Sequence, residues 1–214
     1  MLNMEFDQRV VINTHEQQWL PSPKAGVWRK PLAREEAEHG HATSIVRYDP
    51  GASFSQHAHP KGEEIFVLNG TFSDESGDYP KGSYLRNPDG SRHAPYSKDG
   101  CTLLVKLHQF QNDDQAQVCI ETNTADWLPG YGNLQVLTLH QHKTESVALV
   151  RWPAGEKFQS HTHFGGEEIY VISGEFIDEY GRYPSGTWIR SPHMSTHNPY
   201  VEQDTLIWVK VGHM

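Results

Sequence analysis

Residues 55–70 read SQHAHPKGEEIFVLNG, and the chemistry of this stretch decides how the rest of the chain is interpreted. The apolar IFVL near its end is typical of a buried strand. Residues i and i+2 of a strand share a face, so His57 and His59 project together, and after a short turn Glu63 can fold back beside them. Because unpaired ionisable groups are costly to bury, packing alone does not explain three of them on one inward face.

The chain contains this stretch twice. HAHPKGEEIFV, which begins at His57, aligns without a gap with HTHFGGEEIYV, which begins 104 residues later at His161. About half of the positions between His57 and His93 are identical to their partners in the second copy. Further upstream, VVI at residues 10–12 pairs with VCI at residues 118–120. A repeat of this length indicates a duplicated domain.

The repeat predicts two tandem domains, residues 1–112 and 113–214, joined through a polar QNDDQ segment. Strand-forming segments recur in both halves, separated by glycine, proline and aspartate: residues 43–48, 64–68, 83–86 and 102–107, then 147–152, 168–172, 187–190 and 205–211. The best helical candidate, PLAREEAEH at residues 31–39, is short and polar. Regularly spaced short strands favour a sandwich or barrel over alternating βα units, so we expect an all-β protein.

Composition excludes several classes of function. The net charge of −9 and a pI near 5.8 argue against a nucleic-acid-binding surface. The N-terminus lacks the pattern of a secretory signal, and no apolar stretch approaches the length needed to cross a membrane. Cys101 and Cys119 lack zinc-type spacing. We therefore expect a cytoplasmic protein with reduced thiols and no membrane or nucleic-acid partner.

The 14 histidines include a set that recurs at identical spacing. A divalent metal removes the cost of burying converging imidazoles and a carboxylate, because these groups are its ordinary ligands. The predicted ligands, one set per domain, are His57, His59, Glu63 and His93, and His161, His163, Glu167 and His197. The pairs His39/His41 and His140/His142 share the His-x-His spacing but do not align with each other and lack the following glutamate, so we expect them to be solvated.

These spacings carry a resemblance to a known superfamily. Gly51-x5-His57-x-His59-x3-Glu63-x6-Gly70 fits the first cupin signature, and Gly82-x5-Pro88-x-Gly90-x2-His93 fits the second up to its histidine. The second copy fits likewise, except that Met194 stands where the pattern has glycine, and neither copy has the closing asparagine. The chain therefore resembles a bicupin, which implies two tandem jelly-roll β-barrels.

Both halves are similar to the C-terminal cupin of the ChrR anti-sigma factors, through GEEIFVLNGTFSDE, DYPKGSYLRNP and RHAP in the first copy. The resemblance implies a metal held by three histidines and one glutamate, with zinc most expected and iron as the alternative. Anti-sigma activity in that family resides in a separate N-terminal helical domain. The chain starts directly with the repeat, so we do not expect it to bind a sigma factor.

The resemblance leaves two functions open. One is a module that binds or senses a small molecule, for which four ligands close a tetrahedral zinc site. The other is an Fe(II)-dependent dioxygenase that cleaves a diketone or hydroxyketone, as some cupins do, with open positions on an octahedral iron. Homo-oligomerisation is possible under either.

Other repeated residues have two interpretations each. Phe66, Tyr84, Tyr170 and Trp188 either pack in the core or line a substrate pocket over the metal. Arg86 and Arg190 precede a turn and either anchor it or hold an anionic substrate. Glu64 and Glu168 follow the glutamate ligands and should face the opposite side of their strands.

Overall fold

The structure is a computed structural model of the 214-residue chain, and it describes residues 1–36 and 39–214. Contacts divide the chain into two compact units. The N-terminal unit comprises residues 1–4 and 18–125, and the C-terminal unit comprises residues 5–17 and 126–214. Every regular element among the described residues is a strand, which confirms the all-β prediction. The described residues contain no helix that could cross a membrane.

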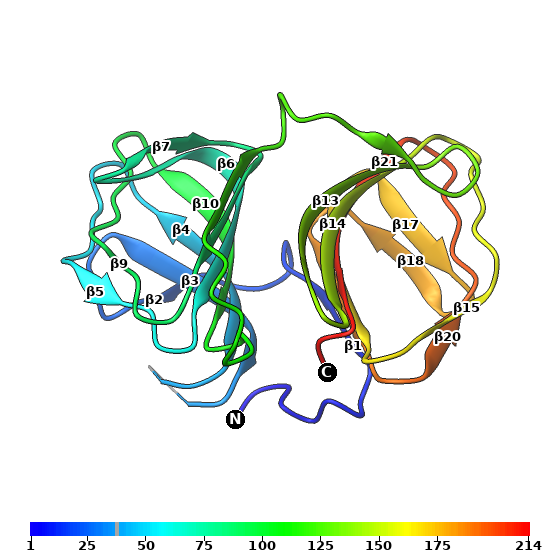
Figure 1. The fold of residues 1–214 in the computed structure, drawn as a ribbon, viewed down its shortest axis with the longest axis horizontal. Helices are drawn as coiled ribbons and strands as arrows, with labels where there is room; N and C mark the ends of the chain where they lie inside the picture. The colour runs from blue at the N-terminus through cyan, green and yellow to red at the C-terminus, as the bar shows by residue number, and fades with distance from the viewer. Residues whose placement is uncertain (37–38) are drawn as a thin grey trace. The chain divides into compact units, whose positions relative to one another are not determined.

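The N-terminal unit is an antiparallel barrel of short strands (Figure 1). Its main sheet has the order β11-β8-β6-β10-β4-β3-β2, with β7 paired to β6 and a separate β5–β9 pair. The strands are β2 (Leu20–Pro21), β3 (Val27–Arg34), β4 (Ala42–Tyr48), β5 (His57–Ala58), β6 (Glu63–Asp74), β7 (Gly77–Pro80), β8 (Ser83–Asn87), β9 (Arg92–His93), β10 (Cys101–Leu107) and β11 (Val118–Glu121).

The C-terminal unit repeats this architecture. Its main sheet has the order β1-β19-β16-β21-β14-β13-β12, accompanied by the pairs β15–β20 and β17–β18. The strands are β1 (Val10–Asn13), β12 (Leu128–Pro129), β13 (Gln135–His142), β14 (Glu145–Trp152), β15 (His161–His163), β16 (Glu167–Ser173), β17 (Glu175–Asp178), β18 (Gly181–Pro184), β19 (Thr187–Ser191), β20 (Ser195–His197) and β21 (Thr205–Val211).

All the strand segments expected from the sequence lie within strands of the structure. The helical candidate at residues 31–39 is wrong: its first four residues, Pro31–Arg34, belong to β3, and residues 37–38 lie outside the described residues. The reason is tertiary. Cross-strand pairing with β4 satisfies the backbone of this segment, and it outweighs the weak helix preference of so short a stretch.

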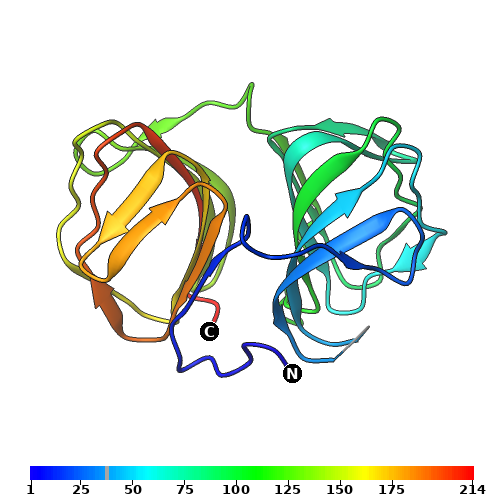
Figure 2. The same cartoon turned by 180° about the vertical axis from the view of Figure 1, so that it is seen from behind.

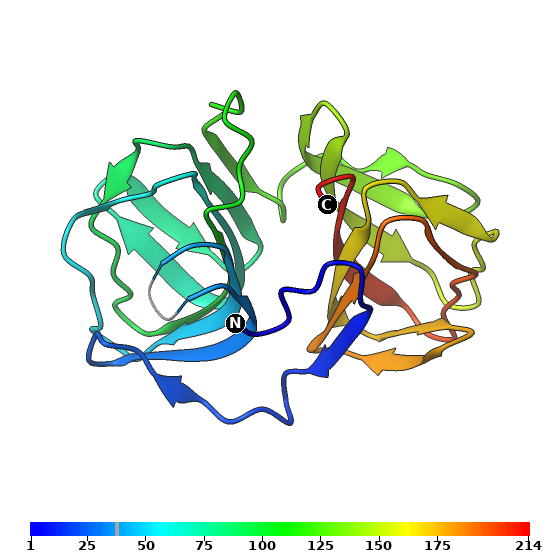
Figure 3. The same ribbon diagram turned by 90° about the horizontal axis from the view of Figure 1, so that it is seen from below.

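Each unit is completed by the first strand of the other repeat. Strand β1 pairs with β19, and its repeat counterpart β11 pairs with β8 (Figures 2 and 3). Both pairings end alike: the hydroxyl of Thr14 donates to the Gly186 carbonyl at 2.7 Å, and that of Thr122 donates to the Gly82 carbonyl at 2.6 Å. The compact units therefore exchange short segments relative to the two sequence repeats.

The core of each unit follows the alternation of side chains along the strands. In the N-terminal unit, Ile65, Val67, Leu85 and Leu103 are fully buried in one cluster, while residues between them face the other side of the sheet. The equivalent cluster of the C-terminal unit contains Ile169, Val171, Ile189 and Ile207. Burial of each such side chain contributes about 1.5–3 kcal/mol, so the barrel interiors hold the sheets in the register that positions the histidines.

Glycine is required where the first cupin signature ends. Gly70 and Gly174 have φ angles of +73° and +79°. A Cβ atom at either would collide with the backbone of the loop before the next long strand, at Gly100 or Asp204. At one other position with positive φ, the second copy has no glycine: Met194 occupies the left-handed region (φ +65°) where the first copy has Gly90.

Candidate metal centres

The first cluster forms where the β5–β9 pair meets the start of β6. His57 lies directly across from His93 in that pair. Glu63 Oε2 is 3.4 Å from Nε2 of His59 and 3.4 Å from Nε2 of His93. The imidazole rings stand edge to face, with centroids 4.5–5.1 Å apart. The four side chains predicted from spacing therefore converge, with one donor atom from each within 4.8 Å of the others.

Hydrogen bonds at Nδ1 orient the three rings. His57 Nδ1 is 3.0 Å from the Ser55 carbonyl, and His93 Nδ1 is 3.3 Å from Asp74 Oδ2. His59 Nδ1 is 2.9 Å from Ser91 Oγ, and because that hydroxyl donates to the Pro88 carbonyl, it must accept from the ring. Each Nδ1 thus carries the proton, and each Nε2 presents a lone pair to the cluster.

The second cluster repeats this geometry in the C-terminal unit. His161 lies across from His197 in the β15–β20 pair, and Glu167 Oε2 is 3.5 Å from His163 Nε2 and 3.7 Å from His197 Nε2. His161 Nδ1 is 3.0 Å from the Gln159 carbonyl.

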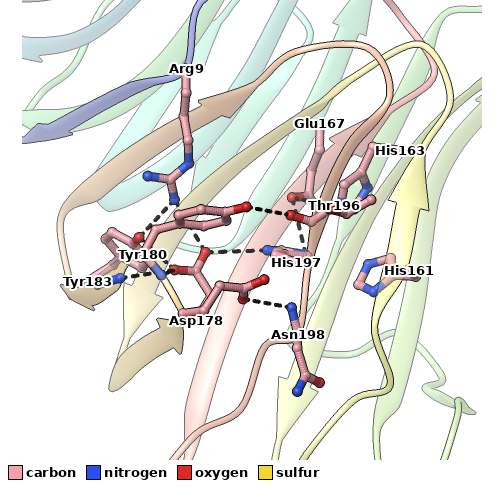
Figure 4. Close-up of polar contacts among 12 residues, drawn as sticks. Arg9, His161, His163, Glu167, Asp178, Tyr180, Tyr183, Thr196, His197 and Asn198 are labelled. Carbon is pink, nitrogen blue, oxygen red and sulfur yellow. Dashed lines mark hydrogen bonds and ion pairs between the residues drawn. The ribbon is translucent and has the colours of Figure 1, made fainter.

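Behind the second cluster lies an arginine from the opposite end of the chain. His197 Nδ1 is 3.4 Å from Asp178 Oδ2. Figure 4 shows Arg9 reaching the same carboxylate and the hydroxyl of Tyr183; Nη2 of Arg9 is 3.2 Å from Asp178 Oδ2 and 2.7 Å from that hydroxyl.

Both clusters fit a bound cation. The Nε2 atoms of His59, His93 and His163, together with Glu167 Oε2, are buried without a hydrogen-bond partner. Metal–ligand bonds of about 2.0–2.2 Å place adjacent donors about 3.0–3.5 Å apart, close to the separations of the carboxylates and imidazoles here. A metal would satisfy these atoms at once, which removes the cost of burying them unpaired.

Electrostatics favours neutral imidazoles. Burial lowers the pKa of His163 to about 3, with neighbouring histidines adding to the effect. Burial likewise lowers the pKa values of His59 and His161. The pKa of Glu167 is raised to about 7, mainly by burial. These three rings are therefore ready to donate lone pairs at neutral pH, as metal ligands must be.

The first cluster opens on a cavity of about 400 Å³ inside the N-terminal unit. His57, His59 and Glu63 form part of its wall. The rest is mainly apolar and includes Phe54 and Ile65. In the C-terminal unit, a pocket of about 340 Å³ lies beside His163 and His197 and is bordered by Arg9, Tyr180, Met194 and Thr196.

The structure does not bring the four candidate substrate residues to the clusters. Phe66 pairs with Tyr84 across β6 and β8, and Tyr170 pairs with Trp188 across β16 and β19. Paired residues share a face, and Phe66 is three positions from Glu63, so strand alternation turns this face away from the ligands. All four side chains are buried, and the hydroxyl of Tyr84 donates to Glu64 Oε1 at 2.6 Å. None of the four lines the cavity beside the first cluster or the pocket beside the second.

The repeated arginines are held by the protein itself. Arg86 pairs with Asp114, lies 3.8 Å from Glu64, and stacks over Phe110. Arg190 donates to the Glu5 carbonyl at 2.9 Å and stacks over Phe6. These contacts give both arginines the anchoring role.

The two histidine pairs that are not repeated differ in exposure. His39 is exposed, as the sequence suggested, and it lies at the edge of the first cavity. The expectation that His140 is solvated is wrong, because only 8% of its surface is exposed. It lies in β13 at the register shift between Thr138 and His140, where Leu139 and His140 are both buried.

Sequence reasoning missed the groups behind the ligands. Asp74 and Asp178 belong to the Asp-Glu pair that recurs in both copies. Their contact with Nδ1 of His93 and His197 could have been predicted, because a histidine that binds a metal usually has a hydrogen-bond partner at its second nitrogen. Arg9 gave no such signal, because its repeat counterpart is Gln117.

Two tandem antiparallel barrels, each with three histidines and one glutamate at one end, define a bicupin. A family model for the ChrR cupin-like domain matches residues 7–111 and again residues 115–214. The chain belongs to the ChrR cupin-like family, as the sequence motifs indicated.

Solved structures share the fold at low identity. A "putative dioxygenase" from Nostoc punctiforme superposes with a TM-score of 0.82 at 17% identity, covering 96% of this chain and 82% of that one. A mutant of Bacillus subtilis oxalate decarboxylase gives 0.65 at 15% identity, covering 94% and 76%. A cupin 2 conserved barrel domain protein from Leptotrichia buccalis gives 0.65 at 12% identity, covering 99% of each. No curated protein matched the chain.

Proposed function

We propose that the protein binds one divalent metal in each unit and that the centre of the N-terminal unit binds a small molecule. His57, His59, Glu63 and His93 would hold the first metal, and His161, His163, Glu167 and His197 the second. The observation that supports a ligand-binding role is the cavity of about 400 Å³ that the first cluster borders. Its size lies within the range of pockets that take small organic molecules.

Zinc is the metal we expect, and iron is the alternative. A bound metal would supply a Lewis acid that accepts an oxygen atom of the ligand. The protein's own contribution is to orient the imidazoles through Ser55, Ser91 and Asp74 and to surround the ligand with a largely apolar wall. Such a site suits a module that binds or senses a small molecule.

The second candidate function is an Fe(II)-dependent dioxygenase acting on a diketone or hydroxyketone. The similarity in fold to the Nostoc punctiforme structure favours it. An oxygenase also needs room for a substrate beside its metal, which the first cavity offers.

Elemental analysis of untagged protein, purified without added metal, tests both functions. Close to two equivalents of metal per chain supports the proposed centres, and less than one equivalent of any metal contradicts them. With iron, oxygen uptake in the presence of diketones and hydroxyketones decides for or against the dioxygenase. With zinc, ligand binding without oxygen uptake is expected.

Other expectations from the sequence remain predictions. These are a cytoplasmic location, the absence of nucleic-acid, membrane and sigma-factor partners, and a possible homo-oligomer. Fractionation of cells and size-exclusion chromatography with light scattering test the first and the last directly.

A further inference from the structure

We propose that the cavity of the N-terminal unit takes a small organic anion, a carboxylate with an apolar body, whose charge is held by Arg29 and Arg34. This inference rests on the proposed function, because it assigns a ligand class to the same metal-bordered cavity. Both arginines belong to β3 and line the cavity wall.

Cross-strand pairing turns both arginines inward. Arg29 pairs with Val46 and Arg34 pairs with Ala42, and these partners on β4 also line the cavity. The two arginines are an odd number of positions apart, so a regular strand would turn them to opposite faces. The register of β3 shifts between Pro31 and Ala33, and this bulge returns Arg34 to the inner face.

The charges of the wall favour an anion. Two arginines line the cavity, with Nε of Arg34 donating to the Glu36 carbonyl at 2.9 Å, and Glu63, the carboxylate in the wall, would be a ligand of the metal. Arg29 lines the same cavity as Glu63 and the buried Tyr48. Arginine presents a planar fork of donors that matches a carboxylate, and such charge-assisted bonds are among the strongest in proteins.

The remainder of the wall selects an apolar body. Ile65, Phe72, Leu103 and Val105 line the cavity and belong to the hydrophobic core cluster of the unit. Phe54 packs against that cluster from the metal end and lies 5.8 Å, ring to ring, from His57. A fully polar anion would leave this surface unfilled, whereas an alkyl or aryl carboxylate would cover it.

The C-terminal unit lacks the arginine pair. Strand β13 pairs with β14 as β3 pairs with β4, and the partner of Val150, the repeat counterpart of Val46, is Val136. The partner of Ser146, the counterpart of Ala42, is Gln141. Neither replacement is charged. We therefore expect one carboxylate per chain, even when both metals are present.

The test is calorimetric titration of the zinc-loaded full-length protein with 3-phenylpropanoate and with its uncharged primary amide. Zinc content is measured on every sample. The carboxylate should bind once per chain, and the amide at least tenfold more weakly. Arg29→Met and Arg34→Met should each weaken carboxylate binding at least tenfold, the loss expected for one charge-assisted contact.

A lysine variant and a matched control distinguish loss of a contact from loss of the fold. Arg29→Lys keeps the charge but not the fork, and should give an intermediate affinity. Arg47→Met is the matched control: it removes a positive charge from β4, but Arg47 lies on the opposite face of the sheet, stacked over Trp19 and Trp28. It should change the affinity less than twofold.

Several results would overturn the inference. They are equal affinity for acid and amide, two carboxylates bound per chain, no binding of 3-phenylpropanoate, or arginine-to-methionine variants that bind like the wild type. If these occur with two zinc ions bound per chain, the anion assignment fails while the metal centres stand. Zinc content below one per chain contradicts the proposed function itself.

Discussion

Arg9 and Asp178 lie 3.2 Å apart, from Nη2 to Oδ2, although they are 169 positions apart in the chain. Asp178 faces Nδ1 of the metal-ligand candidate His197, so Arg9 acts on the second centre through that carboxylate (Figure 4). Burial opposes ionisation of Asp178, but hydrogen bonds from His197 and Tyr183 and the charge of Arg9 leave its pKa lowered. The first centre has the equivalent Asp74 but no arginine at the position of Arg9. The two centres therefore have the same types of candidate ligand but differ in the charge beside the aspartate that contacts the last histidine.

Arg9→Gln, which copies Gln117 of the first copy, should weaken zinc binding at the second centre several-fold. Asp178→Ala should weaken it about 10- to 100-fold, because it removes the direct partner of a ligand. Competition with a chromophoric chelator measures both affinities. Arg182→Gln, on the neighbouring β18 and paired with Glu175 and Glu202, is the control. Equal losses at both centres would contradict the assigned role of Arg9.

The ligand assignment predicts the metal content of single variants. His57→Ala and His161→Ala should each lose about one metal equivalent, because three remaining donors hold a divalent ion far less tightly. His39→Ala should retain both equivalents, since His39 is exposed and outside both clusters. Mass spectrometry of the purified variants measures this directly. Two equivalents in both ligand variants would refute the assignment.

Metal binding to the second centre should release a proton. At pH 6 a carboxyl group with a pKa of about 7 is mostly protonated, so Glu167 must lose its proton to become a ligand, whereas His163, with a pKa of about 3, is already neutral. In the His57→Ala background, calorimetric zinc titrations in buffers of different ionisation enthalpy should show about one proton released. Glu167→Gln should abolish the release, and persistence of the same release would show another origin.

The strand exchange predicts which fragment folds. Residues 18–125 include β11 and should form the N-terminal unit with one bound metal. Truncation to residues 18–116 keeps Asp114, the partner of Arg86, but exposes the edge of β8 and removes four cross-strand pairs, which should cost about 2–5 kcal/mol in the free energy of unfolding. Urea denaturation of the two fragments measures the difference. Equal stabilities would show that β11 contributes nothing to the unit.

The two thiols should differ in reactivity. Burial raises the pKa of Cys101 to about 11, and its side chain is buried, whereas Cys119 is exposed on β11. At pH 8 a chromogenic disulfide reagent should therefore modify Cys119 quickly and Cys101 only on unfolding. Peptide mapping identifies the site, and rapid modification of Cys101 would contradict its burial.

Much of the centre was determined locally. The i and i+2 geometry of His57 and His59, the turn before Glu63 and the return of His93 on a nearby strand follow from short-range backbone rules, so the spacing of the ligands was enough to predict both clusters. The exact duplication of that spacing predicted that there would be two. Strand alternation was also enough to place Phe66, because its odd offset from Glu63 puts its side chain on the face opposite the candidate ligands.

The remaining features depended on tertiary structure. Strands β1 (VVIN) and β11 (VCIE) are repeat counterparts that share two of their four residues, and their local pattern did not predict which sheet each joins. The fold of the whole chain selects the exchanged pairing and thereby carries Arg9 to the second centre. The inward turn of Arg34 depends on a bulge that forms only when β3 is paired with β4. The sequence by itself thus determined which candidate ligands converge in each unit, because their geometry is local, whereas long-range pairing decided what surrounds each cluster.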